Sequence, residues 1–98
     1  MQMSYSSIPL ELHSPKIEQF QIGSLDVKFI FRGEGRWDVI FNINSNKFLI
    51  ALKTAGERIE EFEILTWEGF FDFSYNLIKL IKNIITKLYL LKLAPNLV

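Results

Sequence analysis

The chain has 98 residues, which is enough for one small domain but too few for two hydrophobic cores or for most cofactor-binding α/β folds. Hydrophobic residues make up 49% of the sequence and aromatic residues 14%, so the composition predicts a packed core and excludes a disordered chain. Eleven Lys and Arg balance eleven Asp and Glu, whereas proteins that bind nucleic acid directly usually carry a basic excess. We therefore expect a single domain over residues 1–98 that does not bind nucleic acid directly.

Several residue types that carry chemistry are absent or rare. The sequence contains no Cys, which excludes disulfides, thiolate catalysis and Cys-ligated metal sites. Its single histidine, His13, cannot form a two-histidine metal motif and leaves one conventional acid–base group near neutral pH. We therefore expect no catalytic centre, no cofactor and no metal site. Residues 1–14 lack the pattern of a secretory signal, so the expected location, by elimination, is cytoplasmic.

The first part of the chain has the pattern of an arm followed by strands. Residues 1–15 are rich in serine and proline and are predicted to form an N-terminal arm. Within this arm, Ile8, Leu10 and Leu12 alternate with other residues, so a short extra edge strand is an alternative. Four segments of alternating apolar and polar residues follow, separated by short turns, and together they predict an antiparallel meander. These segments are residues 16–22, 25–32, 36–44 and 47–54.

The lengths of the turns predict which residues face each other across neighbouring strands. All three predicted hairpins place their large apolar side chains on one common face of the sheet. The predicted pairs are Ile22 with Leu25, Phe20 with Val27, Phe31 with Trp37, Phe29 with Val39, Val27 with Phe41, Ile43 with Phe48, Phe41 with Ile50 and Val39 with Leu52.

The segment 57–67 allows two interpretations. As a strand it places Phe62 and Ile64 on one face, with Glu61 and Glu63 on the other; as a helix it places apolar residues on one stripe at a spacing of three. That stripe would contain Ile59, Phe62 and either Leu65 or Thr66. The preceding glycine and the β-branched and aromatic residues favour a fifth strand, so the predicted sheet covers residues 16–66.

Residues 67–93 follow a helical period, with apolar side chains on about half of the helical wheel. Thr66 is the expected N-cap, and the region around Pro95 ends the helix. Four lysines interrupt the apolar stretch and argue against a membrane span, while binding to a membrane surface remains an alternative. Because the sheet needs a cover, core packing is favoured. The predicted fold class is α+β: an antiparallel meander of about five strands on one long C-terminal amphipathic helix.

Acidic residues gather at one point of the sequence, which we call the acidic strip: Glu57, Glu60, Glu61 and Glu63. Residues 57–72 hold six acidic residues against Arg58 alone, a net charge of −5. One interpretation is a solvated strand edge that resists aggregation. The functional hypothesis is a non-catalytic protein-interaction module, of an inhibitor or immunity type. It would use the strip to neutralise a larger partner with a basic surface, such as a nucleic-acid-handling protein.

Two further surfaces are candidates for binding. Ile17, Ile30, Ile40 and Leu49 lie on the predicted outer face of the sheet and form a candidate patch for a homodimer. The alternative function is binding of an apolar small molecule between the helix and the sheet, although the same side chains could simply fill the core. The expected walls are Phe29, Phe31, Trp37, Phe41, Trp67, Phe70 and Phe73.

Overall fold

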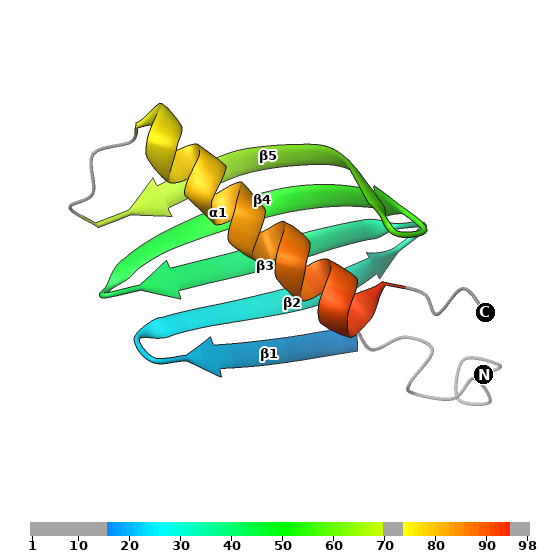
Figure 1. Ribbon diagram of the computed structural model, residues 1–98, viewed down its shortest axis with the longest axis horizontal. Helices are drawn as coiled ribbons and strands as arrows, with labels where there is room; N and C mark the ends of the chain where they lie inside the picture. The colour runs from blue at the N-terminus through cyan, green and yellow to red at the C-terminus, as the bar shows by residue number, and fades with distance from the viewer. Residues whose placement is uncertain (1–15, 70–73, 95–98) are drawn as a thin grey trace, which may run out of the picture.

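Five strands and one helical segment make up the part of the chain that the structure describes (Figure 1). The structure is a computed structural model, which describes residues 16–69 and 74–94 of the chain. The bounds of its elements are β1 Lys16–Ile22, β2 Leu25–Gly33, β3 Arg36–Ile43, β4 Asn46–Ala55, β5 Arg58–Glu68, α1 Tyr75–Leu88 and a π-helical turn, η3, Tyr89–Leu93. The predicted α+β meander with one C-terminal helix is confirmed. The candidate extra edge strand and His13 lie outside the described residues.

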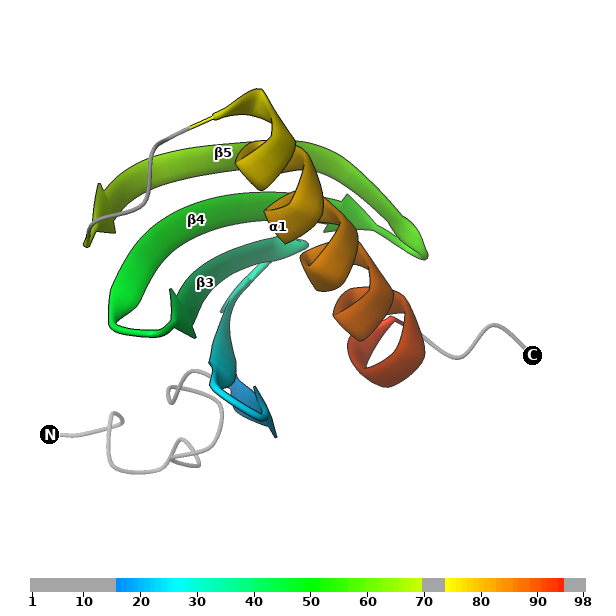
Figure 2. The ribbon, with the colours of Figure 1, turned by 60° about the vertical axis from the view of Figure 1, so that its left-hand side comes forward.

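The strands form one antiparallel sheet in the order β1-β2-β3-β4-β5. Helix α1 crosses one face diagonally, from β5 at its N-terminus towards β2 at its C-terminus, and we call this the inner face (Figure 1). The sheet curves around the helix, and no element among the described residues covers the opposite, outer face (Figure 2). The fold therefore consists of two layers, with the core between them.

The core lies between α1 and the inner face, and it is made almost entirely of apolar side chains. Ile81 and Ile85 of the helix and Phe29 of the sheet are each exposed to solvent by 1% or less. The remaining buried apolar residues are Leu25, Val27, Trp37, Val39, Phe41, Phe48, Ile50, Leu52, Leu88 and Tyr89. No helix among the described residues has both the length and the apolar character needed to cross a bilayer.

The registers of the first two hairpins are confirmed: Phe20 faces Val27, and Phe31 faces Trp37. The register predicted between β3 and β4 is wrong by two residues. Phe41 faces Phe48 rather than Ile50, and Val39 is displaced by the same amount along β4. Because the slip is an even number of residues, every side chain remains on the predicted face.

The turn between β3 and β4 explains this slip. It consists of Asn44 and Ser45, so that Ile43 faces Asn46 rather than Phe48. Both turn residues have positive φ, 48° and 67°, as a type I′ hairpin requires. The side-chain amide of Asn46 donates hydrogen bonds to the carbonyl oxygens of Ile43, at 3.3 Å, and Asn44, at 3.1 Å. These bonds hold Asn46 at the first position of β4.

Apart from Glu57, which lies in the preceding turn, segment 57–67 belongs to strand β5, so the helical interpretation of this segment is wrong. The pairing of β4 with β5 shifts register twice, and each shift inserts one extra residue into β5 as a β-bulge. As a result, the inner-face residues Ile59, Phe62, Ile64 and Trp67 follow one another at spacings of three, two and three. A strand with two bulges can therefore imitate the spacing of a helix.

The predicted start of the helix is also wrong. Strand β5 continues to Glu68, because Trp67 pairs with Phe48 of β4, so Thr66 lies in the strand and does not cap a helix. Helix α1 begins at Tyr75, and the hydroxyl of Ser74 accepts a hydrogen bond of 3.2 Å from the backbone N–H of Leu77. Ser74 is therefore the N-cap of the helix.

Candidate ligand-binding cavity

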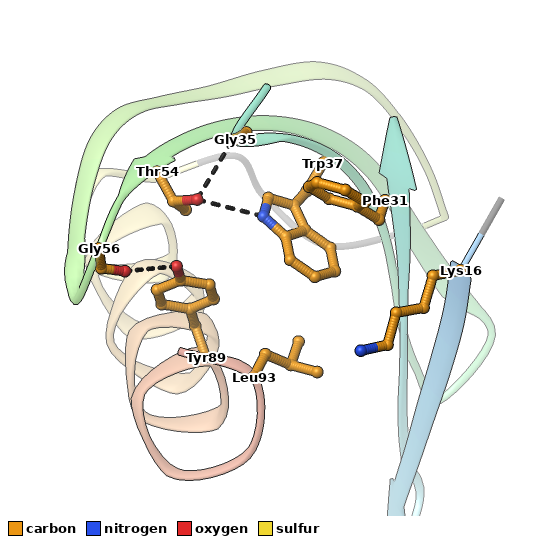
Figure 3. A pocket seen from close by; sticks show the side chains of 8 residues that line it. All are labelled: Lys16, Phe31, Gly35, Trp37, Thr54, Gly56, Tyr89 and Leu93. Carbon is orange, nitrogen blue, oxygen red and sulfur yellow. Dashed lines mark hydrogen bonds between the residues drawn. The ribbon is translucent and has the colours of Figure 1, made fainter. Parts of the chain in front are cut away.

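A cavity of about 390 Å³ lies at the end of the sheet where η3 meets the inner face (Figure 3). Its walls come from the first residue of β1, the neighbouring ends of β2, β3 and β4, two hairpin turns and η3. The lining residues are Lys16, Phe31, Gly35, Trp37, Thr54, Gly56, Tyr89 and Leu93. The meander brings these distant segments together because alternate hairpins of an antiparallel sheet end on the same side.

Aromatic rings form the main wall of the cavity, and Trp37 is at its centre. The indole ring of Trp37 lies 4.8 Å from the ring of Phe31 and 6.0 Å from that of Tyr89, measured between ring centroids. Phe29 contacts the indole from the core side, edge to face at 6.0 Å. Trp37 is only 7% exposed, so its ring is held by packing on several sides. The wall is therefore rigid and apolar.

Apart from the Lys16 ammonium group, the polar side chains of the described wall are bonded to the chain itself. The indole Nε1–H of Trp37 donates to the hydroxyl of Thr54, and this hydroxyl donates to the carbonyl oxygen of Gly35, each at 3.2 Å. The hydroxyl of Tyr89 donates to the carbonyl oxygen of Gly56 at 2.6 Å. Since these groups have partners, they do not require a ligand or water to satisfy them. A bound molecule would meet mainly ring surfaces and aliphatic carbon.

Gly35 allows two strand ends to approach each other at the cavity wall. Its φ of 74° lies in the left-handed region, and a Cβ atom at this position would collide with the backbone carbonyl oxygen of Thr54. The backbone N–H of Thr54 donates to the carbonyl oxygen of Gly35 at 2.8 Å, which closes the gap between the β2–β3 turn and β4. At this point the wall is formed by the backbone of Gly35 and Thr54, and their close contact requires a glycine at position 35.

The π-helical turn η3 shapes the other side of the cavity. The backbone N–H of Ala94 donates to the carbonyl oxygen of Tyr89 at 2.7 Å, a bond that spans five residues instead of four. Both Tyr89 and Leu93 line the cavity. Single π-turns are rare and occur frequently at functional sites. In this protein the turn ends the helix at the cavity.

The aromatic residues expected to form a binding site are only partly brought together. Phe31 and Trp37 line the cavity, while Phe29 and Phe41 are buried in the core. Trp67 stacks on Phe48, with the ring centroids 6.4 Å apart, and is not among the lining residues. Phe70 and Phe73 lie outside the described residues. The sequence interpretation missed Lys16, Gly35, Thr54, Gly56, Tyr89 and Leu93, since no local pattern showed where the helix would end on the sheet.

The acidic strip does not form one row of carboxylates. Glu57 is in the turn between β4 and β5, and Glu60 is the extra residue of a bulge, where it accepts a hydrogen bond of 3.1 Å from Arg58. Glu61 and Glu63 project from the outer face, as the strand interpretation predicted. The strip is therefore divided between a turn, a bulge and one face of the strand.

Cations lie next to these carboxylates. Glu60, Glu61 and Glu63 line a depression of about 600 Å³ together with Arg36 and Lys82. Across the strands, Glu61 also faces Lys53 of β4, whereas Glu63 faces Ala51. This mixture of charges weakens the case for a purely acidic docking surface and agrees with a solvated strand edge.

The candidate oligomer patch lies on the outer face as expected. Ile17 faces Ile30, and Ile40 faces Leu49, so that two apolar pairs extend from β1 to β4. Ile17 is 52% exposed, and the other three are partly buried by their neighbours on the sheet. The two pairs are diagonal neighbours across β2 and β3, where Ile30 faces Asp38 and Ile40 faces Lys28.

No group of three or more residues with metal-binding side chains comes together within residues 16–69 and 74–94. Comparison of the chain with protein-family models, with curated proteins and with solved structures found no match. What the protein binds is therefore inferred from the geometry of the cavity and of the two surfaces.

Proposed function

We propose that this protein is a non-catalytic binding protein that holds a small, largely apolar molecule in the cavity between η3 and the sheet. The observation that carries the proposal is an aromatic-lined cavity of about 390 Å³ in which the polar groups of Trp37, Thr54 and Tyr89 are already paired within the chain. Sites for small molecules are typically concave, mostly apolar and largely preformed. The cavity has these three properties.

The volume sets the size of the ligand. At about 30 Å³ per water molecule, 390 Å³ corresponds to roughly 13 waters, so a ligand of about ten to fifteen non-hydrogen atoms would fit. The ring edges and faces of Phe31, Trp37 and Tyr89 favour a ligand that contains a flat ring, because offset and edge-to-face contacts between rings are attractive.

The titratable groups at the cavity support binding rather than catalysis. Among the described lining residues, Lys16 and Tyr89 are the two with ionisable side chains, and the hydroxyl of Tyr89 is occupied by its bond to Gly56. General acid–base catalysis needs a donor and an acceptor within hydrogen-bond reach of the reacting atoms. A single free ammonium group does not provide both.

Filling the cavity should weaken binding strongly. Leu93→Trp places a larger side chain in the cavity, so less space remains for a ligand. We expect this variant to bind phenylbutyramide, a neutral aromatic probe, at least about tenfold more weakly than the wild-type protein. Ligand-observed saturation-transfer NMR measures the affinity. Leu91→Trp is the matched control, because Leu91 is on the same π-turn but 77% exposed and not a lining residue. Equal binding by both variants would contradict the proposal.

A second function, protein interaction through the outer face of the sheet, is favoured by a separate observation. The apolar run from Ile17 to Leu49 lies on a face that no described element covers (Figure 2). Glu63 on the same face forms no ion pair with a described residue. A second copy of the chain would bury the apolar run. A basic partner, as an inhibitor or immunity-type role requires, would instead meet Glu61 and Glu63.

Self-association through this face is expected to be sensitive to one buried charge. Ile40→Glu should shift a dimer to monomer in sedimentation velocity, because an unpaired carboxylate at the centre of an apolar contact is costly. Gln19→Glu, in the same cross-strand row but at the exposed edge of β1, should leave the distribution unchanged. A wild-type protein that remains monomeric at the highest soluble concentration would exclude the dimer.

A further inference from the structure

Lys16 brings to the cavity a charge that no described lining residue balances. It is the first residue of β1 and faces Phe31 across the sheet, so its side chain lies on the inner face. Figure 3 shows this side chain extending from the edge strand towards Leu93, with the nitrogen at the side of the cavity opposite Tyr89 and Thr54. The ammonium group therefore lies across the space from Tyr89, while Phe31 of the aromatic wall is the direct neighbour of Lys16 on β2.

No acidic residue is among the lining residues that the structure describes. Lys16 forms no ion pair within 4 Å with any residue of the described part of the chain. The nearest acid on the same face of β1 is Glu18, two residues along the strand and so about 7 Å away, and it faces Phe29 rather than the cavity. The wall donors on Trp37 and Tyr89 are already used. Within residues 16–69 and 74–94, the cavity thus combines apolar walls with one cation that has no counter-charge there.

We infer that the ligand of this cavity is an apolar monocarboxylate, with an aromatic or short aliphatic body against the wall and its carboxylate bound to Lys16. This inference rests on the proposed function and names its ligand class. A neutral molecule would partly desolvate the ammonium group without replacing its hydrogen bonds, and a cationic molecule would be repelled. A phosphate group, with more charge and more acceptor oxygens, calls for several donors, whereas the described wall offers one free ammonium group.

A pair of isosteric probes isolates the effect of charge. Phenylbutyrate and phenylbutyramide have the same shape, each with about a dozen non-hydrogen atoms, which fits the size derived from the volume. Isothermal titration calorimetry at low ionic strength should show the acid binding about 5- to 20-fold more tightly than the amide, the range expected between an exposed ion pair and a charge-assisted hydrogen bond. Added salt should reduce this preference by screening.

Two lysine variants assign the preference to one residue. Lys16→Met keeps most of the aliphatic stem but removes the charge, and we expect it to bind the acid and the amide with affinities within about twofold of each other. Lys28→Met is the matched control: it makes the same charge change on the outer face of β2, away from the cavity, and should retain the preference. Both positions are outside the core, and circular dichroism would confirm that each variant folds.

The outcomes separate this inference from the proposed function. If the wild-type protein bound the acid and the amide equally, charge selection would be wrong while ligand binding would stand. If Lys16→Met retained the full preference for the acid, the assignment to Lys16 would be wrong. If neither probe bound, the proposed function and this inference would both fail.

Discussion

Replacing Ile85 with alanine is expected to destabilise the protein by about 2–5 kcal/mol, the usual cost of removing a large aliphatic side chain from a core. Ile85 is completely buried and lies on α1, where it packs between the helix and the inner face of the sheet. A typical domain is stable by only about 5–15 kcal/mol, so the loss would be a large fraction of the total. Urea unfolding followed by far-ultraviolet circular dichroism measures the change.

The matched control for this substitution is on the same helix. Leu80→Ala removes a similar side chain at a position that is 55% exposed, and we expect it to cost less than about 1 kcal/mol. Similar losses for Leu80→Ala and Ile85→Ala would mean that α1 does not use this face to cover the sheet. The two-layer architecture would then be wrong.

Replacing Gly35 with alanine is expected to destabilise the protein by about 2–5 kcal/mol. The left-handed φ of 74° costs a residue with a side chain about 1–2 kcal/mol, and displacing the carbonyl of Thr54 adds the cost of overpacking, about 1–3 kcal/mol. The same displacement would disturb the hydroxyl bond from Thr54 to Gly35 and, through it, the position of Trp37. Thermal unfolding and probe affinity would both change.

Gly23→Ala separates backbone strain from the close contact. Gly23 also has a positive φ, 59°, but no atom lies within 4 Å of a Cβ built there. We therefore expect Gly23→Ala to cost about 1–2 kcal/mol, from the backbone conformation alone, and to leave probe binding unchanged. A Gly35→Ala variant as stable as Gly23→Ala would show that the contact with Thr54 is not tight.

The sheet could be predicted from the sequence because its signals are local and consistent. Alternating residues such as Val27, Phe29 and Phe31 define one face, and the short turns leave few registers to choose from. Even the wrong register beside Asn44 and Ser45 kept the correct face, since the error was two residues. The error in register therefore changed which residues face each other but not the face on which each side chain lies.

The errors arose where local pattern and tertiary pairing disagree. In β5, two bulges changed the spacing of the inner residues and gave part of the strand the period of a helix. At the start of the predicted helix, Trp67 fits the apolar stripe of a helix but pairs with Phe48 in the sheet. Pairing with β4 fixes both segments, and the sequence of β5 alone does not contain this information.

The candidate site was only partly predictable for the same reason. Trp37 and Phe31 could be identified as candidate walls from composition and alternation, but so could Phe29, which is buried in the core. The cavity exists because α1 crosses the sheet diagonally (Figure 1) and ends in the π-turn. This turn contributes Tyr89 and Leu93 to the cavity wall. Both are tertiary features.

Amide NMR titration of the wild-type protein with phenylbutyrate tests ligand binding at the cavity most directly. We expect saturable shifts in the indole N–H of Trp37 and in the backbone amides of Gly35, Thr54, Gly56 and Leu93, because these groups line the cavity. The amides of Ile40 and Leu49, which lie on the outer face, should remain unchanged. The absence of saturable shifts up to the solubility limit of the probe, or shifts confined to the outer face, would contradict a binding site in this cavity.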